Sequence, residues 1–453
     1  MMAGSGSACI SQSMLIAALP AIMRQFEVDA TLGQLLTTSY IFTLGLISAL
    51  SAFLVRRVRT KPLFLAAMLF FLVGCVAALV APDYWTLLAA RLLQAGGAGV
   101  TLPLIQVVAL SLYPKSQYGK AMGIVGLIIG FAPAIGPTIS GLLIDQFGWH
   151  SVFVALACVA APVIVVSALL MPSGIVERSG EKPSFDTASF AQYTVGFCAC
   201  MAGVTVAESF GVFEPACWLL VAFGAAVLAV FARRQLRAPS PFLKLSCFRN
   251  PVFAVSAVLV VLAHVAFMSG AIMVPLFVQD VQMRSAALSG LIILPGAVLL
   301  GFLNPVTGKA LDRVGPMPLV AVGGVVITAG TFAFSVLDPA ASEVWVTVLY
   351  GLRVVGVACL MMPMTAYGCA ALPKEDLAQA TAILTSFRQI LGSMASSVLI
   401  AVMAAASSNE IGVDAAGFEA SFALQAVVMA VGTAACFVLL AKLGGRRARR
   451  REG

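Results

Sequence analysis

The stretch GIVGLIIGFAPAIGPTISG, residues 123–141, lies inside a longer apolar run and sets how the rest of the sequence is interpreted. Small residues recur along it at a spacing of four, in two rows: Gly126 and Gly130, then Ala132, Gly136 and Ser140. In a bilayer, such rows let neighbouring helices approach at backbone distance. Pro133 and Pro137 bend a helix, which a membrane tolerates where neighbours or a wet cavity satisfy the freed carbonyls. We therefore expect a bent, closely packed membrane helix, either a packing element or a hinge.

The composition indicates a polytopic membrane protein. Of the 453 residues, 61% are hydrophobic and 10% are charged, whereas about a quarter of a soluble domain is charged. The ten cysteines lie mostly within apolar runs, at spacings that fit neither a metal site nor a disulfide framework. The first apolar run has no signal-peptide cleavage pattern, so we interpret it as a retained span.

Apolar runs long enough to cross a bilayer, which takes about 20 residues, divide the chain into helices. The fourteen expected spans are 5–23, 33–55, 62–81, 85–112, 119–143, 150–171, 189–207, 214–232, 252–278, 286–306, 316–336, 343–366, 378–404 and 420–441.

The lysines and arginines test this count, because cytoplasmic loops carry the excess of both. Alternating the spans places 22 of them on one side and only Arg24 and Arg284 on the other, with Arg91, Arg353 and Arg388 in or at the ends of spans. We therefore predict a multi-pass membrane protein with both termini in the cytoplasm. The net charge of +8 comes from these loop clusters and does not indicate a nucleic-acid partner.

Two patterns repeat at an offset of eight spans and predict the domain organisation. A basic turn after small residues occurs at 51–62 and at 308–318, and an arginine followed by glycines and a proline occurs at 91–103 and at 353–363. Repeated halves are typical of transporters. We expect six-helix halves at 1–172 and 251–441, two extra helices with linkers at 173–250, and a basic cytoplasmic tail at 442–453. The connection 232–251 is either an amphipathic surface segment or a plain linker.

Three segments contain short motifs. Residues 123–141 contribute Gly123, Gly136, Pro137 and Gly141; the fourth span, RLLQAGGAGVTLPL, contributes Arg91, Gln94, Gly97, Gly99 and Pro103; and the turn GKALDRVG contributes Gly308, Asp312, Arg313 and Gly315.

With these motifs the chain resembles the major facilitator superfamily, and within it the fourteen-helix drug:proton antiporter branch that includes lincomycin and multidrug exporters. The resemblance covers nearly the whole chain. It implies an all-α protein of a bacterial inner membrane with the major facilitator fold and 14 transmembrane helices. It also identifies the first motif with the antiporter motif, the second with the family's arginine motif and the third with its cytoplasmic gate.

Two departures from the branch concern charge. Its first-helix motif carries an aspartate where this sequence has Ser11 and an asparagine where it has Ile16, and the gating motif of the first half has lost its aspartate near Val55. Every acidic residue lies in a loop or near a helix end, Glu208 among them. The sequence therefore offers no mid-membrane carboxylate to carry a proton, which favours neutral or anionic substrates over lipophilic cations.

Polar residues within spans are candidates for proton coupling or for a polar cavity. A charged arginine at a span's centre costs about 2.5–3.5 kcal/mol on insertion scales, so Arg91 and Arg353 need partners. Each is either a structural arginine bound to neighbouring helices or, with Gln94, part of the proton path. His264 lies near the middle of the ninth span. With an ordinary pKa near 6.5 it is either a proton carrier or a neutral core residue.

The remaining candidates concern the gate and the substrate. Asp312 and Arg313 form either a charge clasp that holds one conformation closed or a solvated turn. Phe131, Phe267 and Met268 are candidates for an adaptable apolar pocket, with plain helix packing as the alternative.

Together these features predict a secondary exporter of small amphiphilic compounds, a monomer working by rocking two halves, with the proton as coupling ion. No phosphate-binding loop, metal site or other cofactor motif is present in the sequence. The alternatives are an uncoupled metabolite or anion exporter on the same fold and, from another class, a membrane-embedded enzyme or sensor. An enzyme would need a cluster of nucleophiles or metal ligands, which the two histidines do not supply.

Overall fold

The structure is a computed structural model that describes residues 1–28, 30–172, 174–175, 185–211, 214–238, 241–407 and 414–452. Within the helices, the described side chains exclude those of residues 16–17, 30–31, 34, 133–135, 138, 208–210, 286–287 and 444–452. The inferences made above for Ile16, Pro133 and Glu208 therefore concern side chains outside the described set.

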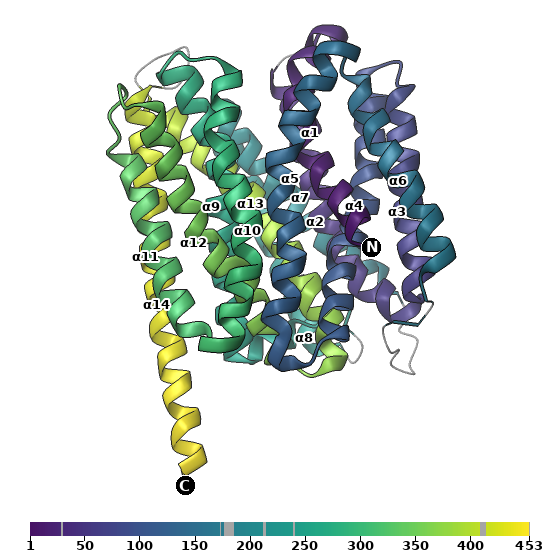
Figure 1. Ribbon diagram of the computed structural model, residues 1–453, viewed down its shortest axis with the longest axis vertical. Helices are drawn as coiled ribbons and strands as arrows, with labels where there is room; N and C mark the ends of the chain where they lie inside the picture. The colour runs from purple at the N-terminus through teal and green to yellow at the C-terminus, as the bar shows by residue number, and fades with distance from the viewer. Residues whose placement is uncertain are drawn as a thin grey trace. The chain divides into compact units, whose positions relative to one another are not determined.

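The described residues form fourteen α-helices, which confirms the all-α prediction (Figure 1). They are α1 (Met2–Phe26), α2 (Ala30–Arg57), α3 (Thr60–Leu79), α4 (Tyr84–Leu112), α5 (Tyr118–Phe147), α6 (His150–Leu170), α7 (Thr187–Phe210), α8 (Pro215–Arg237), α9 (Pro251–Leu276), α10 (Ala286–Val314), α11 (Pro316–Ser335), α12 (Glu343–Ala370), α13 (Leu377–Ala406) and α14 (Ala415–Glu452). Short helical segments lie at Lys115–Gln117, Leu245–Arg249, Phe277–Val281 and Lys374–Asp376.

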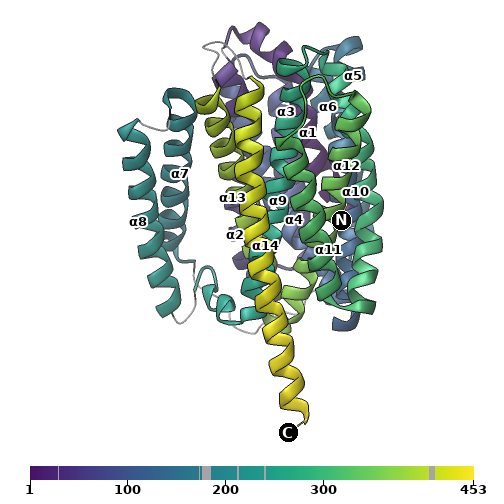
Figure 2. The same ribbon diagram turned by 90° about the vertical axis from the view of Figure 1, so that its left-hand side faces the viewer.

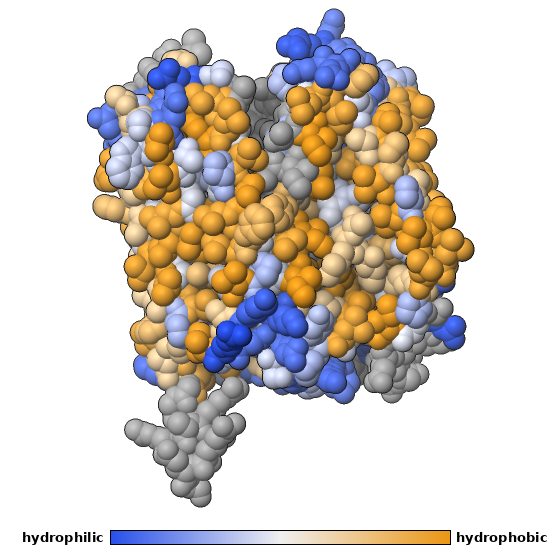
Figure 3. Space-filling view, in the orientation of Figure 1, coloured by the Kyte–Doolittle hydropathy of each residue, from blue (hydrophilic) through white to orange (hydrophobic). Residues whose placement is uncertain are grey.

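Most of these helices are long and apolar enough to cross a membrane. Among the described residues, twelve meet that criterion, and thirteen do if Met2–Leu15 and Ala18–Phe26 form one span. Figure 3 shows hydrophobic residues over the middle of the visible helices and hydrophilic residues gathered near their ends. Such a surface is typical of helices that face lipid along their length.

The chain folds into two compact units whose segments are not continuous in sequence. The first comprises Met1–Pro114, Val125–Ser184 and Lys374–Ile390, and the second comprises Lys115–Ile124, Phe185–Pro373 and Leu391–Gly453. The start of α5 therefore belongs to the second unit and the start of α13 to the first. The predicted halves at 1–172 and 251–441 are continuous, and their boundaries stay a prediction.

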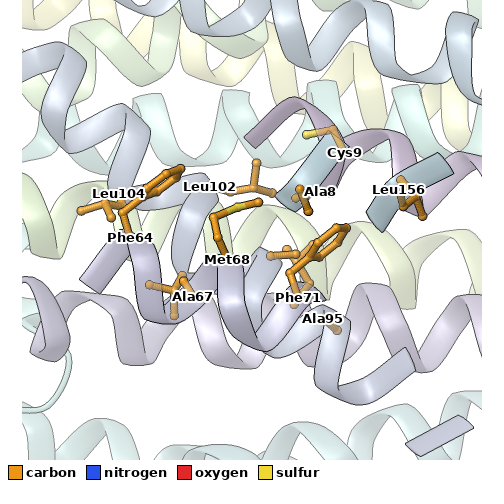
Figure 4. Close-up of a cluster of buried hydrophobic side chains, with 14 of the residues drawn as sticks. Ala8, Cys9, Phe64, Ala67, Met68, Phe71, Ala95, Leu102, Leu104 and Leu156 are labelled. Carbon is orange, nitrogen blue, oxygen red and sulfur yellow. The ribbon is translucent and has the colours of Figure 1, made fainter. Parts of the chain in front are cut away.

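The core of the first unit forms where α1, α3, α4 and α6 meet. Its buried side chains include Ala8, Cys9, Phe64, Ala67, Met68, Phe71, Ala95, Leu102, Leu104 and Leu156 (Figure 4). Helices α3 and α4 approach at backbone distance through two glycines, since a Cβ at Gly97 would lie 2.3 Å from the carbonyl oxygen of Ala67 and one at Gly74 would lie 2.7 Å from the backbone nitrogen of Gln94. This contact fixes the depth and rotation of α4, which carries Arg91.

The adjacent glycines Gly96 and Gly97 provide a matched test of this packing. Gly97→Ala is expected to destabilise the protein by about 1–3 kcal/mol, because backbone atoms of α3 must move. Gly96 has no atom within 4 Å of a Cβ position, so Gly96→Ala is expected to be neutral or to stabilise by up to about 1 kcal/mol through helix propensity. Thermal unfolding of the two purified variants in one detergent compares them, and equal midpoints would contradict the assigned packing.

In the second unit, α11 and α12 also approach at backbone distance through glycine. A Cβ at Gly356 would lie 2.7 Å from the backbone nitrogen of Ile327 and 2.9 Å from the carbonyl oxygen of Gly323. The third and fourth helices of each predicted half are thus packed through glycine, which is consistent with six-helix halves that repeat at an offset of eight spans.

Helices α7 and α8, at the positions of the two predicted extra helices, lie side by side as a hairpin (Figure 2). A Cβ at Gly224 of α8 would lie 2.6 Å from the carbonyl oxygen of Gly196 of α7.

At one end of the hairpin Asp186 accepts hydrogen bonds from the backbone and hydroxyl of Ser189 and pairs with Arg234 at 3.0 Å. Although slight burial opposes it, these bonds hold the pKa of Asp186 below its ordinary value. In the connection 232–251, Phe242, Leu243 and Cys247 are buried.

Candidate transport site

Arg91 is the centre of a buried polar network in the first unit. The side chain is 0% exposed, and its Nη1 donates to the hydroxyl of Ser11 on α1 at 2.9 Å and to Oε1 of Gln94 at 2.7 Å. Its guanidinium carbon lies 4.1 Å from the ring centroid of Tyr40 on α2, within cation–π distance. The sequence placed Arg91 and Gln94 one turn apart, and the structure joins them directly.

The partner of Arg91 on α1 is Ser11, the residue that we expect to replace an aspartate of the branch that the sequence resembles. Both the hydroxyl and the carbonyl oxygen of Ser11 accept from Arg91. These acceptors are neutral. They hold the guanidinium in place without cancelling its charge, so Arg91 keeps a net positive charge inside an apolar unit.

Arg353 is the centre of a second buried network, in the second unit. Its Nη2 donates to the hydroxyl of Ser269 on α9 at 2.8 Å and to Oε1 of Gln425 on α14 at 2.5 Å. Gln425 also donates to Ser269 at 2.6 Å, which closes a triangle of hydrogen bonds. The ring centroid of Phe422 lies 5.4 Å from the guanidinium carbon.

The two networks share a plan. In each unit an arginine on the fourth helix of a predicted half binds a serine hydroxyl on the first helix of that half and lies over an aromatic ring. The acceptor amide differs, because Gln94 comes from the arginine's own helix and Gln425 comes from α14. The repeat inferred from Arg91 and Arg353 therefore extends to Ser11 and Ser269, which sequence reasoning did not pair.

Buried charge among the described side chains is positive. The buried charged residues are Arg91, Arg353 and Arg388, and no described aspartate, glutamate or lysine is buried. Two ion pairs between described residues, Asp186 with Arg234 and Arg284 with Glu343, lie near helix ends. The described part of the chain thus places three guanidinium groups inside the fold with no carboxylate to balance them.

His264 lies on α9 in the second unit and is 5% exposed. Its ring rests against Gly392 of α13, where a Cβ would lie 2.6 Å from Cδ2, and its centroid is 6.1 Å from that of Phe267. Phe267 is buried and Met268 is half-buried on the same helix, whereas Phe131 is half-buried on α5 in the first unit. A pocket shared by Phe131, Phe267 and Met268 stays a prediction.

The antiporter-motif glycines of α5 have different neighbours. A Cβ at Gly123 would meet backbone atoms of Asn304 and Pro305 on α10 at 2.8 and 2.9 Å, and one at Gly136 would collide with the hydroxyl of Ser13 on α1. Ser13 donates to the carbonyl oxygen of Ala132 at 3.1 Å. Gly141 has no atom within 4 Å of its Cβ position. Pro137 lies between these glycines within α5.

The residues of the predicted cytoplasmic gate lie at the end of α10. Both carboxylate oxygens of Asp312 accept from backbone N–H groups at the start of α5, from Gly119 at 2.8 Å and from Lys120 at 2.7 Å. The unpaired N–H groups and the dipole of a helix N-terminus both favour a carboxylate there. Arg313 is exposed beside this contact, and Gly315 ends α10 with a φ of 78°.

Two further contacts hold the start of α5 in the second unit. Gly119 and Gly308 touch through their backbones, since a Cβ on either would lie within 2.2 Å of the other's carbonyl oxygen. The Nζ of Lys115 donates to the carbonyl oxygens of Ala370, the last residue of α12, and of Leu372, at 3.2 and 2.7 Å. The sequence motif identified Gly308 and Asp312 but not Gly119, whose small size is informative only once its neighbour is known.

Polar and charged side chains buried within long apolar helices indicate a functional site inside the membrane-spanning part of the protein. The sequence profile described as the Major Facilitator Superfamily matches residues 1–397. The chain therefore belongs to this superfamily, as the motifs indicated, and is a multi-pass membrane transporter and not an enzyme.

The chain is similar in sequence to bacterial transporters and in structure to a human one. Over 444 residues the chain is 36% identical to the uncharacterized MFS-type transporter YcnB of Bacillus subtilis (strain 168), covering 97% of this chain and 93% of that one. Over 399 residues it is 32% identical to the lincomycin resistance protein LmrB of the same organism, covering 87% and 82% of the two chains. The human organic anion transporter MFSD10 (TETRAN) has the same fold, with a TM-score of 0.70, 12% identity and 97% of both chains covered.

Proposed function

We propose that this protein is a secondary active exporter of small amphiphilic compounds, drugs among them, driven by a proton gradient across a bacterial inner membrane. The observation that carries the proposal is the similarity to LmrB over 87% of the chain, because that relative is named for drug resistance. Similarity to the multidrug transporter MdtP of Bacillus subtilis (strain 168), 26% identical over 380 residues, supports the same class.

The proposed architecture has fourteen spans, with both termini in the cytoplasm and the protein working as a monomer. The twelve spans found among the described residues, together with α1 and α5, make up that number. With 30 residues α5 is long enough, because about 20 suffice. The halves 1–172 and 251–441 rock about a substrate site, 173–250 adds two helices, and the basic tail 442–453 remains in the cytoplasm.

In this mechanism the α5–α10 contact forms the cytoplasmic gate, and Arg91 with Gln94 shapes the proton path. His264 is the proposed proton carrier, with a neutral, hydrogen-bonded imidazole as the alternative. One proton is sufficient as a driving force. It releases about 2.3 kcal/mol per 100 mV and about 1.4 kcal/mol per pH unit, which together sustain a substrate gradient of several hundredfold.

A second candidate is a facilitator or metabolite exporter without proton coupling. One observation favours it: no described carboxylate is buried, and a buried carboxylate is the usual proton-carrying group of membrane transporters. The two functions differ in a single property, the response of the flux to a pH gradient.

Accumulation in cells tests the export function. In a bacterium stripped of its own efflux pumps, the protein is expected to lower accumulation of radiolabelled lincomycin, or of a compound from a neutral and anionic panel, by about threefold or more. A protonophore is expected to abolish the effect. Protection that persists with the protonophore would favour the facilitator, and no effect on any compound would overturn export.

Two glycines of α5 supply matched controls for this assay. Gly123→Ala places a Cβ against backbone atoms of α10 and is expected to lose export, whereas Gly141→Ala meets no atom and is expected to retain it. Comparable amounts of both variants in the membrane make the comparison valid.

A further inference from the structure

The environment of Arg353 differs from that of an arginine with a purely structural role. The side chain is 1% exposed on α12, and its polar contacts all use one nitrogen, Nη2, which binds Ser269 and Gln425. Its Nε and Nη1 are buried and have no hydrogen-bond acceptor among the described residues. A buried N–H without a partner is unfavourable by about 1–3 kcal/mol, and more for a charged group. The protein therefore retains an unfavourable arrangement that an apolar residue would remove.

Arg91 provides an internal comparison. It uses both terminal nitrogens, with Nη1 on Ser11 and Gln94 and Nη2 on the Ser11 carbonyl oxygen, so that only Nε lacks a partner. Arg353 has two such nitrogens. Of the two related networks, the one in the second unit therefore has the greater remaining capacity to donate hydrogen bonds.

The surroundings of Arg353 hold its guanidinium in position. Ser269 and Gln425 hold Nη2, and the mutual bond between them restricts both. The glycine at 270 lets Nη1 lie against α9, because a Cβ there would be only 2.9 Å from that nitrogen. A guanidinium held in this way presents its remaining donors in a fixed direction, so that less side-chain entropy is lost on binding.

The charge of Arg353 has no counter-charge among the described residues. A guanidinium stays protonated in proteins, and no described acidic side chain is buried. Within a membrane span such a charge is stabilised by an opposite charge or by a polar cavity.

We propose that Arg353 receives the negative group of a carboxylate-bearing amphiphilic substrate, with Ser269 and Gln425 as positioning residues. This inference rests on the proposed export function and specifies its substrate class. A carboxylate is expected to accept a charge-assisted hydrogen bond from Nη1, which has no acceptor among the described residues. Uncharged and cationic analogues of the same substrate lack the group that Arg353 binds.

Ligand-dependent stability of the purified, full-length protein in detergent tests the proposal. Thermal unfolding is followed with a thiol-reactive dye that reports exposure of the cysteines, in the presence of 2-naphthoate, 2-naphthamide or 2-naphthylmethylammonium. These three probes share an aromatic body and differ in charge. The expected result is a rise in the unfolding midpoint with 2-naphthoate and little or no rise with the other two.

Variants assign that effect to one arginine. Arg353→Gln is expected to weaken the apparent affinity for 2-naphthoate by about tenfold, and Arg353→Lys, which keeps the charge but not the planar donors, by less. Arg388→Gln removes another buried guanidinium and is the matched control, expected to bind within about threefold of the natural protein. The midpoint without ligand shows whether each variant is folded, and Arg353→Lys replaces Arg353→Gln if the latter is not.

Three results would overturn the proposal: no stabilisation by 2-naphthoate, equal stabilisation by the amide, or equal loss of affinity in Arg388→Gln and the Arg353 variants. Export measured separately in vesicles distinguishes this failure from failure of the proposed function. Proton-driven export of neutral compounds without carboxylate binding would refute the substrate class alone. Carboxylate binding through Arg353 without transport of any compound would refute the proposed export function, while the proposed binding site would stand.

Discussion

Arg91→Gln is expected to lower export by about a hundredfold, the largest effect anticipated for a single side chain. Arg91 binds three acceptor groups on α1 and α4 and lies 4.1 Å from the ring of Tyr40. Glutamine is too short to maintain these contacts, and the hydroxyl of Ser11 then loses its donor inside the first unit. Three helices, α1, α2 and α4, lose their common partner.

Two further variants separate charge from geometry at this position. Arg91→Lys keeps the charge but lacks the planar guanidinium whose N–H groups reach Ser11 and Gln94. Its export is expected to lie between that of Arg91→Gln and that of the natural protein. Ser11→Ala removes one hydrogen-bond acceptor of Arg91 and is expected to lower export by about tenfold or less. Export is measured in everted vesicles at equal protein amounts. Normal export by Arg91→Gln would show that neither the charge of Arg91 nor its contacts with α1 and α2 are needed for transport.

Asp312→Asn is expected to reduce export by about twentyfold and to weaken the proposed cytoplasmic gate. The carboxylate accepts from Gly119 and Lys120 at the start of α5, and hydrogen bonds to charged groups contribute about 1.5–3 kcal/mol each. An asparagine offers one neutral acceptor oxygen in place of two charged ones. The contact between α10 and the start of α5 is therefore expected to open more often.

Alkylation of Cys369 measures this opening. Cys369 is fully buried at the end of α12, beside Ala370, whose carbonyl oxygen accepts from Lys115 before α5. Maleimide labelling of Cys369 in detergent is expected to be about tenfold faster in Asp312→Asn. Lys309→Gln, an exposed change one turn earlier on α10, is the control, and Cys369→Ser identifies the labelled site. An unchanged labelling rate would mean that Asp312 does not hold this contact closed.

Much of the fold was predictable because it depends on local properties of the sequence. Apolar length predicted most of the helices closely, as in the fourth span, expected at 85–112 and observed as α4, Tyr84–Leu112. Helices α10 and α14 end at Val314 and Glu452, well beyond the expected ends at 306 and 441. The family followed from motif spacing. These sequence patterns are reliable because a bilayer excludes charged side chains and backbone N–H and C=O groups without hydrogen-bond partners along every helix.

The partners of the candidate residues were not predictable in the same way. Gly96 and Gly97 are adjacent and alike in sequence, and only the rotation of α4 against α3 decides which of them tolerates a side chain. Gln425 reaches Arg353 from 72 positions away. Polar residues inside spans are a signal that points to Ser269 and Gln425, but their pairing depends on how α9, α12 and α14 pack together.

The central claim is that export is coupled to a proton gradient although no described carboxylate is buried. Flux in reconstituted vesicles tests this claim most directly. Proteoliposomes with a pH-sensitive dye inside are supplied with substrate, with and without an imposed pH gradient, for the natural protein, Arg91→Gln and His264→Gln. We predict that the gradient drives substrate uphill, that substrate flux moves protons, and that one or both variants abolish both. Substrate flux that ignores the gradient and leaves the internal pH unchanged would contradict the claim and identify the protein as a facilitator.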